Sequence, residues 1–334
     1  MEDAREAVAD FAGAVPSNVV FTSGGTEANN LAVLGGPWRS LVISAVEHDS
    51  VLAAADRSDA NVVRIPTDRD GVVDLVALRG ILLAVERPTL VSVMLVNNET
   101  GVIQPVAGVA ELAREFNATV HCDAVQAAGR LDLDITALGA DLLTLSAHKI
   151  GGAQGVGALV IADAVGIAAQ IVGGGQELRR RAGTENTAGI AGFAAAVEAV
   201  KHDLTRVTRW RALRDRTEAR LMAQPGAAIL GAGAERVANT ICVAMPGVPS
   251  ETQVMALDLD GIAVSAGAAC SSGKVGPSHV LAAMGVDQGL ADCAIRVSFG
   301  WQTKESDLGR FFESWGSLYR RTRRGESNEG RPAA

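Results

Sequence analysis

The sequence predicts an α/β protein: a mainly parallel sheet covered by helices, followed by a smaller C-terminal α+β domain. Short runs rich in Val, Leu and Ile alternate with helical patterns, as in a parallel sheet whose crossovers are helices. The 334 residues are enough for one large and one smaller domain. Hydrophobic residues make up 48% of the chain and aromatic residues only 4%, so the core is expected to consist of Ala, Val, Leu and Ile.

The elements of the expected sheet follow one another in a regular order. Apolar runs typical of buried strands occupy residues 18–23, 40–46, 61–65, 90–96, 118–125 and 141–149. Helical patterns lie at 26–35, after a Gly-Gly turn, at 74–85, which starts with an Asp, and at 105–117, which opens on a Pro. This alternation predicts that the carboxyl ends of the strands meet at one edge of the sheet.

A long helical pattern at 187–223, continuous or broken, is expected to lead from the first domain into the second. Shorter patterns follow it. The predicted domains are therefore a large domain over residues 1–205 and a small one over 206–320. The charged, Gly-containing residues 321–334 are expected to form a disordered tail.

Composition excludes several classes of protein. The net charge of −8, without a long basic run before the C-terminus, argues against a nucleic-acid-binding surface. No apolar stretch approaches the length of a membrane span, and the acidic N-terminus lacks the apolar region of a signal peptide, so a cytoplasmic protein is expected. The four cysteines show no paired zinc spacing and are expected to be reduced and unlinked.

Ligands of open α/β sheets bind at the carboxyl ends of the strands. Four predicted strands are followed there by polar residues or by glycines that suit a phosphate: Gly24-Gly25-Thr26, Asn97-Asn98-Glu99, Asp123 with Gln126, and Ala147-His148-Lys149. Each signal is weak by itself. Asp123 alone is more often a helix N-cap, and a lone lysine is usually solvated.

Lys149 is less usual because it comes directly after an apolar strand and before Gly151-Gly152. A desolvated lysine loses its charge and can form a Schiff base. Pyridoxal phosphate needs such a lysine, an acid for its ring nitrogen and a cradle for its phosphate. Lys149, Asp123 and Gly25-Thr26 are candidates for these three parts.

A series of longer motifs carries a resemblance to a known family. In chain order they are "FTSGGTEANNLA", "EHDSV", "VNNETGVIQPV", "HCDAVQAAGRLDLD", "LSAHKIGGAQGVGAL", "RRAGTENTAGI", "SAGAACSSG", "GPSHVLAAMG" and "IRVSFG". The sequence resembles the cysteine desulfurases of the nitrogen-fixation and iron–sulfur-cluster type, in the class V aminotransferase branch of pyridoxal-phosphate-dependent enzymes. The likeness runs from about Glu2 to about Tyr319. The resemblance implies a further N-terminal segment, and the expectation is either a wrongly assigned start or a truncated protein.

The resemblance implies a type I pyridoxal-phosphate-dependent transferase fold and a role for each matching residue. Lys149 matches the lysine that binds the cofactor covalently, and Asp123 the acid that pairs with its ring nitrogen. Gln126 matches the partner of the ring hydroxyl, and His48 the histidine that stacks on the ring and assists proton transfer. Phosphate contacts are implied for Gly25, Thr26, Ser146 and His148, and from the second subunit for Thr184.

Asn98 and Arg296 match residues that orient the substrate, Arg296 through a fork onto its carboxylate. Asn98 is also an expected cofactor contact. Cys270 matches the nucleophile; Lys274 nearby is expected to lower its pKa. The loop around Cys270 is rich in Gly and Ser, which suits a thiol that must reach both a cofactor and a partner protein. No permanently bound metal is expected, although Cys270 is a candidate transient iron–sulfur ligand. The other three cysteines lie in apolar runs and are expected to be core residues.

The function that the resemblance implies is conversion of L-cysteine to L-alanine with a persulfide on Cys270. The sulfur would go to an iron–sulfur scaffold or sulfur-carrier protein, or to tRNA or cofactor thiolation, and the enzyme would be a homodimer. Three alternatives stay open: another class V enzyme, such as one that cleaves selenocysteine or kynurenine; a truncated, non-catalytic homologue that docks sulfur-transfer partners; and a nucleotide-binding protein, which no Walker or dinucleotide motif supports.

Overall fold

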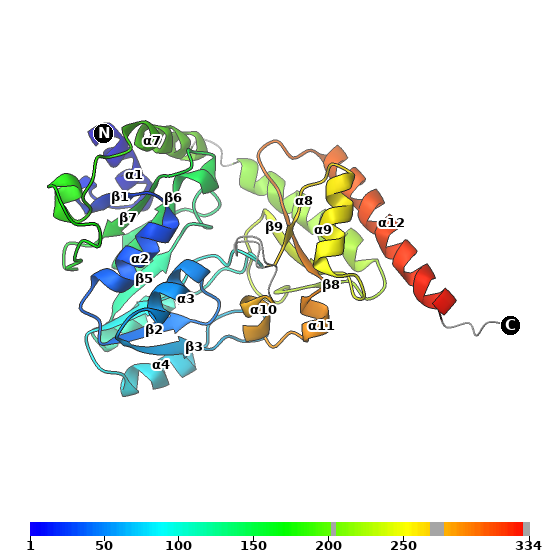
Figure 1. The fold of residues 1–334 in the computed structure, drawn as a ribbon, viewed down its shortest axis with the longest axis horizontal. Coiled ribbons are helices and arrows are strands. Elements are labelled where there is room, and N and C mark those ends of the chain that lie inside the picture. The colour runs from blue at the N-terminus through cyan, green and yellow to red at the C-terminus, as the bar shows by residue number, and fades with distance from the viewer. Residues whose placement is uncertain (202–204, 268–276, 330–334) are drawn as a thin grey trace. The chain divides into compact units, whose positions relative to one another are not determined.

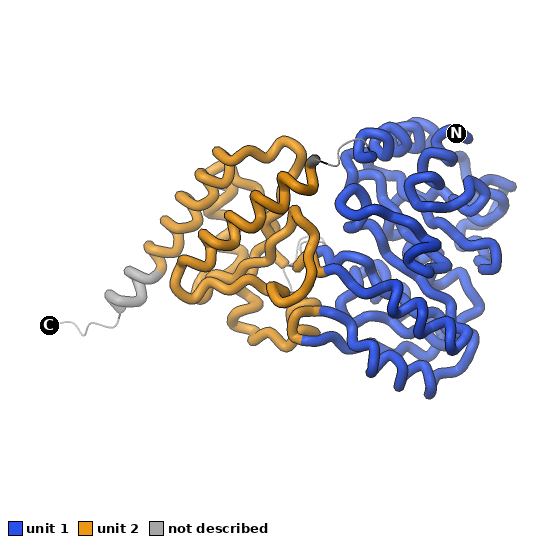
Figure 2. The backbone as a smooth tube through the Cα atoms, turned by 180° about the vertical axis from the view of Figure 1, so that it is seen from behind, with its two compact units in different colours: residues 1–68, 72–98, 103–204 blue, residues 69–71, 99–102, 205–334 orange. Residues whose placement is uncertain are grey.

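The chain forms two compact units in a computed structural model that describes residues 1–201, 205–267 and 277–329. Unit 1 comprises residues 1–68, 72–98 and 103–204, and unit 2 comprises residues 69–71, 99–102 and 205–334, as Figure 2 shows in two colours. Two short segments from the first half of the sequence thus belong to the C-terminal unit. The sequence predicted one boundary, near residue 205, and gave no sign of these segments.

Unit 1 is built on a seven-stranded sheet. The strands are β1 (Val19–Thr22), β2 (Ser40–Ser44), β3 (Asn61–Ile65), β4 (Thr89–Ser92), β5 (Thr119–Asp123), β6 (Leu142–Ser146) and β7 (Gly157–Ile161), in the spatial order β1-β7-β6-β5-β4-β2-β3. The five strands from β6 to β3 run parallel, whereas β7 is antiparallel to both β6 and β1. The predicted mainly parallel sheet is confirmed, and β7 is a strand that the sequence reading did not include.

Helices cover the sheet of unit 1 (Figure 1). They are α1 (Glu2–Ala12), α2 (Gly25–Gly35), α3 (Asp49–Asp56), α4 (Leu75–Ala84), α5 (Val106–Glu115), α6 (Ile135–Leu138) and α7 (Thr187–Lys201). The Asp74 carboxylate caps α4 by accepting from the N–H groups of Val76 and Ala77, as the sequence led us to expect. Neighbouring residues on one strand, such as Leu142 and Leu143, are both fully buried, so both faces of the sheet are covered.

Unit 2 contains a four-stranded antiparallel sheet in the order β10-β11-β9-β8. Its strands are β8 (Ala228–Ile229), β9 (Thr240–Ala244), β10 (Ser265–Ala266) and β11 (Ala294–Ser298), and its helices are α8 (Thr205–Met222), α9 (Ser250–Leu259), α10 (His279–Ala283), α11 (Gln288–Ala291) and α12 (Glu305–Glu329). The core of this unit includes Trp315, which is 1% exposed, stacks on Tyr319 and donates from its indole to Gln253.

Residues 321–329 were predicted to belong to a disordered tail, but they continue helix α12 to Glu329. The added residues are mostly Arg, Glu, Ser and Asn, and Arg and Glu favour a helix where no proline intervenes. Pro332 lies beyond the helix, among residues 330–334, which the structure does not describe. Within the described ranges, no helix is both long enough and apolar enough to cross a membrane.

Gly157 allows the turn after β1 to approach β7 closely. Both Thr22, at the end of β1, and Ser146, at the end of β6, are paired with Gly157. A Cβ atom on Gly157 would lie 2.6 Å from the carbonyl carbon of Gly24 and 2.7 Å from the carbonyl oxygen of Leu145. These are backbone atoms, so a side chain here would displace the segment that leads into α2.

We expect Gly157→Ala to lower the free energy of unfolding by about 1–3 kcal/mol, the usual cost of overpacking a close contact. Urea unfolding followed by circular dichroism measures the change. Gly166→Ala is the matched control, since a Cβ there meets no atom within 4 Å. A Gly157 variant as stable as that control would contradict the argument.

His121, in the middle of the sheet, is a fully buried histidine held by two hydroxyl groups. Its Nδ1 lies 2.8 Å from Ser92 Oγ and its Nε2 lies 3.0 Å from Thr144 Oγ1, on the two neighbouring strands. Burial lowers the pKa of His121 from 6.5 to about 4, and the nearby charge of Asp123 offsets only part of that effect. The ring is therefore neutral in the native protein at neutral pH.

A histidine whose pKa is lower in the native state stabilises the fold above its unfolded pKa. As the pH falls from about 6.5 to about 4, His121 binds a proton in the unfolded chain but not in the native protein. The free energy of unfolding therefore decreases over this pH range. We expect that the free energy of unfolding of His121→Gln falls less between pH 7 and pH 4 than that of the unaltered protein, by about 3 kcal/mol. Urea titrations at each pH test this, and equal losses in the two proteins would contradict it.

Candidate functional site

The residues predicted to form a cofactor site follow strands whose carboxyl ends share one edge of the sheet in unit 1. β2, β4, β5 and β6 are parallel, and β1 has the same direction because both it and β6 are antiparallel to β7. The site therefore collects residues from five strand ends. They are Gly25 and Thr26 after β1, His48 after β2, Asn98 after β4, Asp123 and Gln126 at and after β5, and Ser146, His148 and Lys149 at and after β6.

Asp123 ends β5 and is only 5% exposed. One carboxylate oxygen accepts from the backbone N–H of Val125 at 2.9 Å, and the other accepts from Asn29 Nδ2 at 2.7 Å. The bond to Val125 closes a turn rather than capping a helix, because no helix follows β5 directly. Both oxygens are thus fixed in direction before any ligand binds.

A chain of hydrogen bonds links Asp123 to His48. Asn29 Nδ2 also donates to Ser50 Oγ at 2.8 Å, and Ser50 Oγ lies 2.7 Å from His48 Nδ1. The backbone N–H of Ser50 donates to the same Nδ1 at 3.1 Å, so Nδ1 is an acceptor and the Ser50 hydroxyl is a second donor to it. The ring proton of neutral His48 is therefore on Nε2.

His48 is also the N-cap of α3, which is the ordinary role that its position predicts. The capping bond fixes the ring at χ1 and χ2, so the structural role and the proposed chemical role use different nitrogens of one side chain. The His48 residue is neither buried nor fully exposed.

The N-terminus of α2 is open. Its N-cap is Gly24, and no side chain forms a capping hydrogen bond to it. Free N–H groups at the start of an eleven-residue helix attract anions, and phosphates in particular. A Cβ atom on Gly25 would lie 2.9 Å from Val125 Cγ2 and 3.5 Å from Ser146 Cβ, so this helix start is packed against the turns after β5 and β6. Thr26, in the first turn, is exposed.

Lys149 lies in η2 (Ala147–Ile150), a single turn that ends at Gly151 in the left-handed conformation. In the same turn, His148 Nδ1 lies 2.9 Å from Ser146 Oγ. The pKa of His148 is lowered, first by partial burial and then by the positive charge of Lys149. Repulsion between these neighbours favours a neutral imidazole beside the lysine, which leaves His148 able to accept or donate a hydrogen bond.

The surroundings of Asp123 disfavour a second negative charge. Burial and the charge of Asp123 raise the pKa of Glu47 well above its usual range, which favours the neutral form of its carboxyl group. The same two causes raise the pKa of the Cys122 thiol, which is fully buried. Together with neutral His121, this leaves Asp123 as the negative group that a cationic ring nitrogen would meet.

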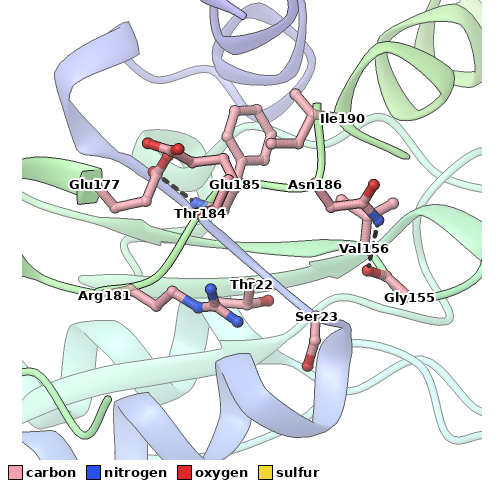
Figure 3. A pocket seen from close by; sticks show the side chains of 11 residues that line it. Thr22, Ser23, Gly155, Val156, Glu177, Arg181, Thr184, Glu185, Asn186 and Ile190 are labelled. Carbon is pink, nitrogen blue, oxygen red and sulfur yellow. Dashed lines mark hydrogen bonds between the residues drawn. The ribbon is translucent and has the colours of Figure 1, made fainter. Parts of the chain in front are cut away.

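Gln126, Asn98 and Thr184 are less buried than Asp123. Gln126 is half-buried in the turn after β5, and Asn98 is half-buried at the point where the chain leaves unit 1. Thr184 is exposed and lines a pocket of about 110 Å³ together with Thr22, Ser23 and Arg181, as Figure 3 shows. The structure brings Thr184 to the segment that leads into α2, rather than to Asp123.

Arg296 belongs to unit 2. It lies on β11, opposite Ser265 of β10 and Cys242 of β9, and its Nη2 donates to Ser265 Oγ at 3.2 Å. Buried Glu99, which follows Asn98 in the chain, belongs to the same unit and accepts from Ser278 Oγ at 2.6 Å.

Cys270 and Lys274 lie outside the described residues. The other three cysteines are confirmed as buried and unlinked: Cys122, Cys242 and Cys293. Burial, with the charge of Glu99 as a second cause, raises the pKa of Cys242 to about 12. A thiol at that pKa is not a nucleophile at neutral pH.

Sequence reasoning missed Asn29 and Ser50 as parts of these networks. Asn29 lies inside a predicted helical pattern, where a polar residue has no distinctive signature, and Ser50 lies in α3, a helix that the sequence reading did not include. The one available signal was the apolar surroundings: a polar residue on the buried side of a helix needs a partner, and Asn29 is 1% exposed.

The residues at this edge fit pyridoxal phosphate. A buried carboxylate with both oxygens oriented suits a pyridinium nitrogen, an uncapped helix start suits a phosphate, and a lysine follows the neighbouring strand. Asp123, the N-terminus of α2 and Lys149 would hold the three ends of the group.

Comparison with known proteins gives the same result. Residues 1–311 match the aminotransferase class-V family. A cysteine desulfurase of Cereibacter sphaeroides is 44% identical over 322 residues, which cover 93% of this chain and 82% of that protein. An IscS-like cysteine desulfurase of Mycobacterium tuberculosis is 38% identical over 340 residues, covering 97% and 86%.

Solved structures include a NifS-like protein from Rickettsia africae, which superposes with a TM-score of 0.88 at 33% identity and covers 95% of this chain and 87% of that one. The predicted pyridoxal-phosphate-dependent transferase fold is confirmed by this likeness. Since the family match spans most of the sequence and the relatives are covered along most of their own length, the chain belongs to the aminotransferase class-V family of pyridoxal-phosphate-dependent enzymes.

Proposed function

We propose that this protein is a cysteine desulfurase that converts L-cysteine to L-alanine and retains the sulfur as a persulfide on Cys270. The observation that carries the proposal is the hydrogen-bonded chain Asp123–Asn29–Ser50–His48 at the sheet edge where Lys149 and the open start of α2 also lie. The names of the relatives support the substrate.

Around the cofactor, each residue has a task that its environment suits. Asp123 would hold the ring nitrogen, Gln126 the ring hydroxyl, and His48 the face of the ring. Gly25, Thr26, Ser146 and His148 would bind the phosphate, at the uncapped helix start and the adjoining turn. When bound, pyridoxal phosphate supplies an electron sink for the charge that develops at the substrate Cα.

The remaining chemistry belongs to side chains of this protein. Lys149 takes the proton from Cα and His48 assists its return. The Cys270 thiolate attacks the sulfur of the substrate; a new S–S bond forms and the C–S bond breaks, with its electron pair left on the carbon side. Protonation of that carbon gives L-alanine, and the substrate sulfur stays on Cys270. Asn98 and Arg296 orient the substrate, Arg296 by pairing with its carboxylate.

The working form in this proposal is a cytoplasmic homodimer that delivers sulfur to an iron–sulfur scaffold or sulfur-carrier protein. Three exposed apolar side chains in the segment of the sequence that precedes Thr184 support a contact surface for another protein: Ile171, Val172 and Leu178 are 43%, 80% and 65% exposed. Such a cluster on one short segment is typical of a surface covered by another chain. Thr184 would then complete the phosphate site of the second subunit.

Cys270→Ser tests the reaction. We expect this variant to bind pyridoxal phosphate normally and to lose sulfide and alanine production from L-cysteine by at least about 10³-fold, because a serine hydroxyl without an activating base is a poor nucleophile toward sulfur. Mass spectrometry should find an added sulfur on the Cys270 peptide of the unaltered protein and none on the variant.

Cys293→Ala is the control, since it removes a buried thiol and should leave turnover largely intact. Undiminished sulfide release from Cys270→Ser would exclude the desulfurase mechanism and favour a lyase of the same fold.

Arg296→Gln tests the assignment of the substrate carboxylate. Removing one partner of a charged pair usually costs on the order of 2–5 kcal/mol, so we expect a large rise in the KM for L-cysteine with little change in cofactor affinity. Ser265→Ala, which removes only the hydroxyl that Arg296 contacts, should have a small effect. Equal losses of cofactor and substrate affinity in Arg296→Gln would mark the residue as structural.

A further inference from the structure

A buried carboxylate anchors the segment that leads to Thr184. Glu177 lies in η3 (Gln176–Arg179), and its side chain is 1% exposed. It forms a two-pronged ion pair with Arg5 of α1, at 2.8 Å to Nη1 and 2.9 Å to Nη2, and it accepts from the backbone N–H of Phe21 in β1 at 2.9 Å. Both oxygens are used, and the Arg5 guanidinium lies 4.9 Å from the ring centroid of Phe21.

The backbone at this anchor has an unfavourable conformation. Glu177, Leu178 and Arg179 have φ values of 45°, 54° and 64°, in the left-handed region that residues with a side chain avoid. Three such residues in succession persist only where surrounding contacts determine the conformation. The contacts that Glu177 makes with Arg5 and Phe21 are suited to that task because they are buried and charge-assisted.

A second ion pair ties the same segment to the start of α2. Arg181 contacts Glu27 at 2.9 Å from Nε and 3.3 Å from Nη2, and Glu27 also accepts from the backbone N–H of Ser23 at 2.8 Å. Burial is the largest single influence on the pKa of Glu27 and would raise it. The hydrogen bonds from Arg181 and Ser23 together outweigh burial, so the pKa of Glu27 is lowered. Glu177, Arg181 and Thr184 line one pocket with Ser23 (Figure 3).

We propose that Glu177 is a positioning residue that holds Thr184 in place for the phosphate site of a second copy of this chain. The proposal rests on the proposed function, which assigns Thr184 to that site. Its new content is the cause: the Glu177–Arg5 pair stabilises a left-handed turn, and the turn determines where Thr184 is presented. Glu177 itself contacts neither cofactor nor substrate.

Glu177→Gln keeps the size of the side chain and removes its charge. We expect it to raise the dissociation constant for pyridoxal phosphate about tenfold, measured by quenching of tryptophan fluorescence, while the KM for L-cysteine stays unchanged in the cofactor-saturated enzyme. Glu185→Gln is the matched control: it removes the same charge from a residue that lines the same pocket and should leave cofactor affinity unchanged. If Glu177→Gln does not fold, Arg5→Gln provides a second test, because it removes the other partner of the ion pair. We expect Arg5→Gln to raise the dissociation constant for pyridoxal phosphate by a similar factor.

A mixed dimer separates positioning from general damage. Consider a dimer of one Glu177→Gln subunit and one Lys149→Ala subunit. The cofactor site that contains the intact Lys149 receives Thr184 from the Lys149→Ala subunit, in which Glu177 is unaltered. We expect one site per dimer with the cofactor affinity of the unaltered protein. A weak site in the mixed dimer, or a Glu177→Gln homodimer that binds as tightly as the Glu185→Gln control, would overturn the inference. Failure of the unaltered protein to bind pyridoxal phosphate would instead overturn the proposed function.

Discussion

The arrangement at the functional edge of unit 1 depends on keeping the carboxylate of Asp123 buried and oriented. Placing a charge in an apolar sheet is costly unless hydrogen bonds compensate it, and here one bond comes from the backbone of Val125 and one from Asn29. The neighbouring groups respond to that charge: the pKa values of Glu47 and of the Cys122 thiol are both raised, so the anionic form of each is disfavoured. Asn29 matters most because it connects this charge to Ser50 and so to the histidine.

The same edge shows how ordinary structural devices also serve a reaction. His48 caps α3, Gly24 is the N-cap of α2, and Gly157 allows the turn after β1 to approach β7 closely. Each would be expected in a protein without catalytic activity. Their combination is informative, because an uncapped helix start, an oriented imidazole and a buried carboxylate all occur at the same edge of the sheet.

Much of the sheet could be predicted from the sequence, since buried parallel strands are nearly continuous apolar runs. Strand β3 matches its predicted residues 61–65. β7 was missed because Gly155 and Gly157 interrupt the apolar pattern, although the second glycine is required by the backbone that approaches it. The residues that follow the strands were predicted by direct chemical reasoning and by resemblance, whereas Asn29 and Ser50 depend on a helix rotation that no local pattern reveals.

The buried role of Glu177 could not be predicted from the sequence, for a different reason. Glu177 stands in the charged run "QELRRR", which reads as a solvated surface, and its partner Arg5 is far away in the sequence. Only the folded chain shows that one member of this run is buried against β1 while Leu178, its neighbour, is 65% exposed. Likewise, the assignment of residues 69–71 and 99–102 to unit 2 results from tertiary contacts and not from composition.

The division of the chain into its two units has a practical and an evolutionary consequence. Because residues 99–102 belong to unit 2, where the carbonyl of Gly101 accepts from the N–H of Val237, neither unit is an uninterrupted length of polypeptide. Cutting the gene at the codon for residue 205 would separate Val237 from its partner and would leave residues 69–71 and 99–102 of unit 2 on the other fragment. Recombination that exchanges one half between homologues would have to preserve a four-residue piece embedded in the other half, which favours inheritance of the whole chain as a single cassette.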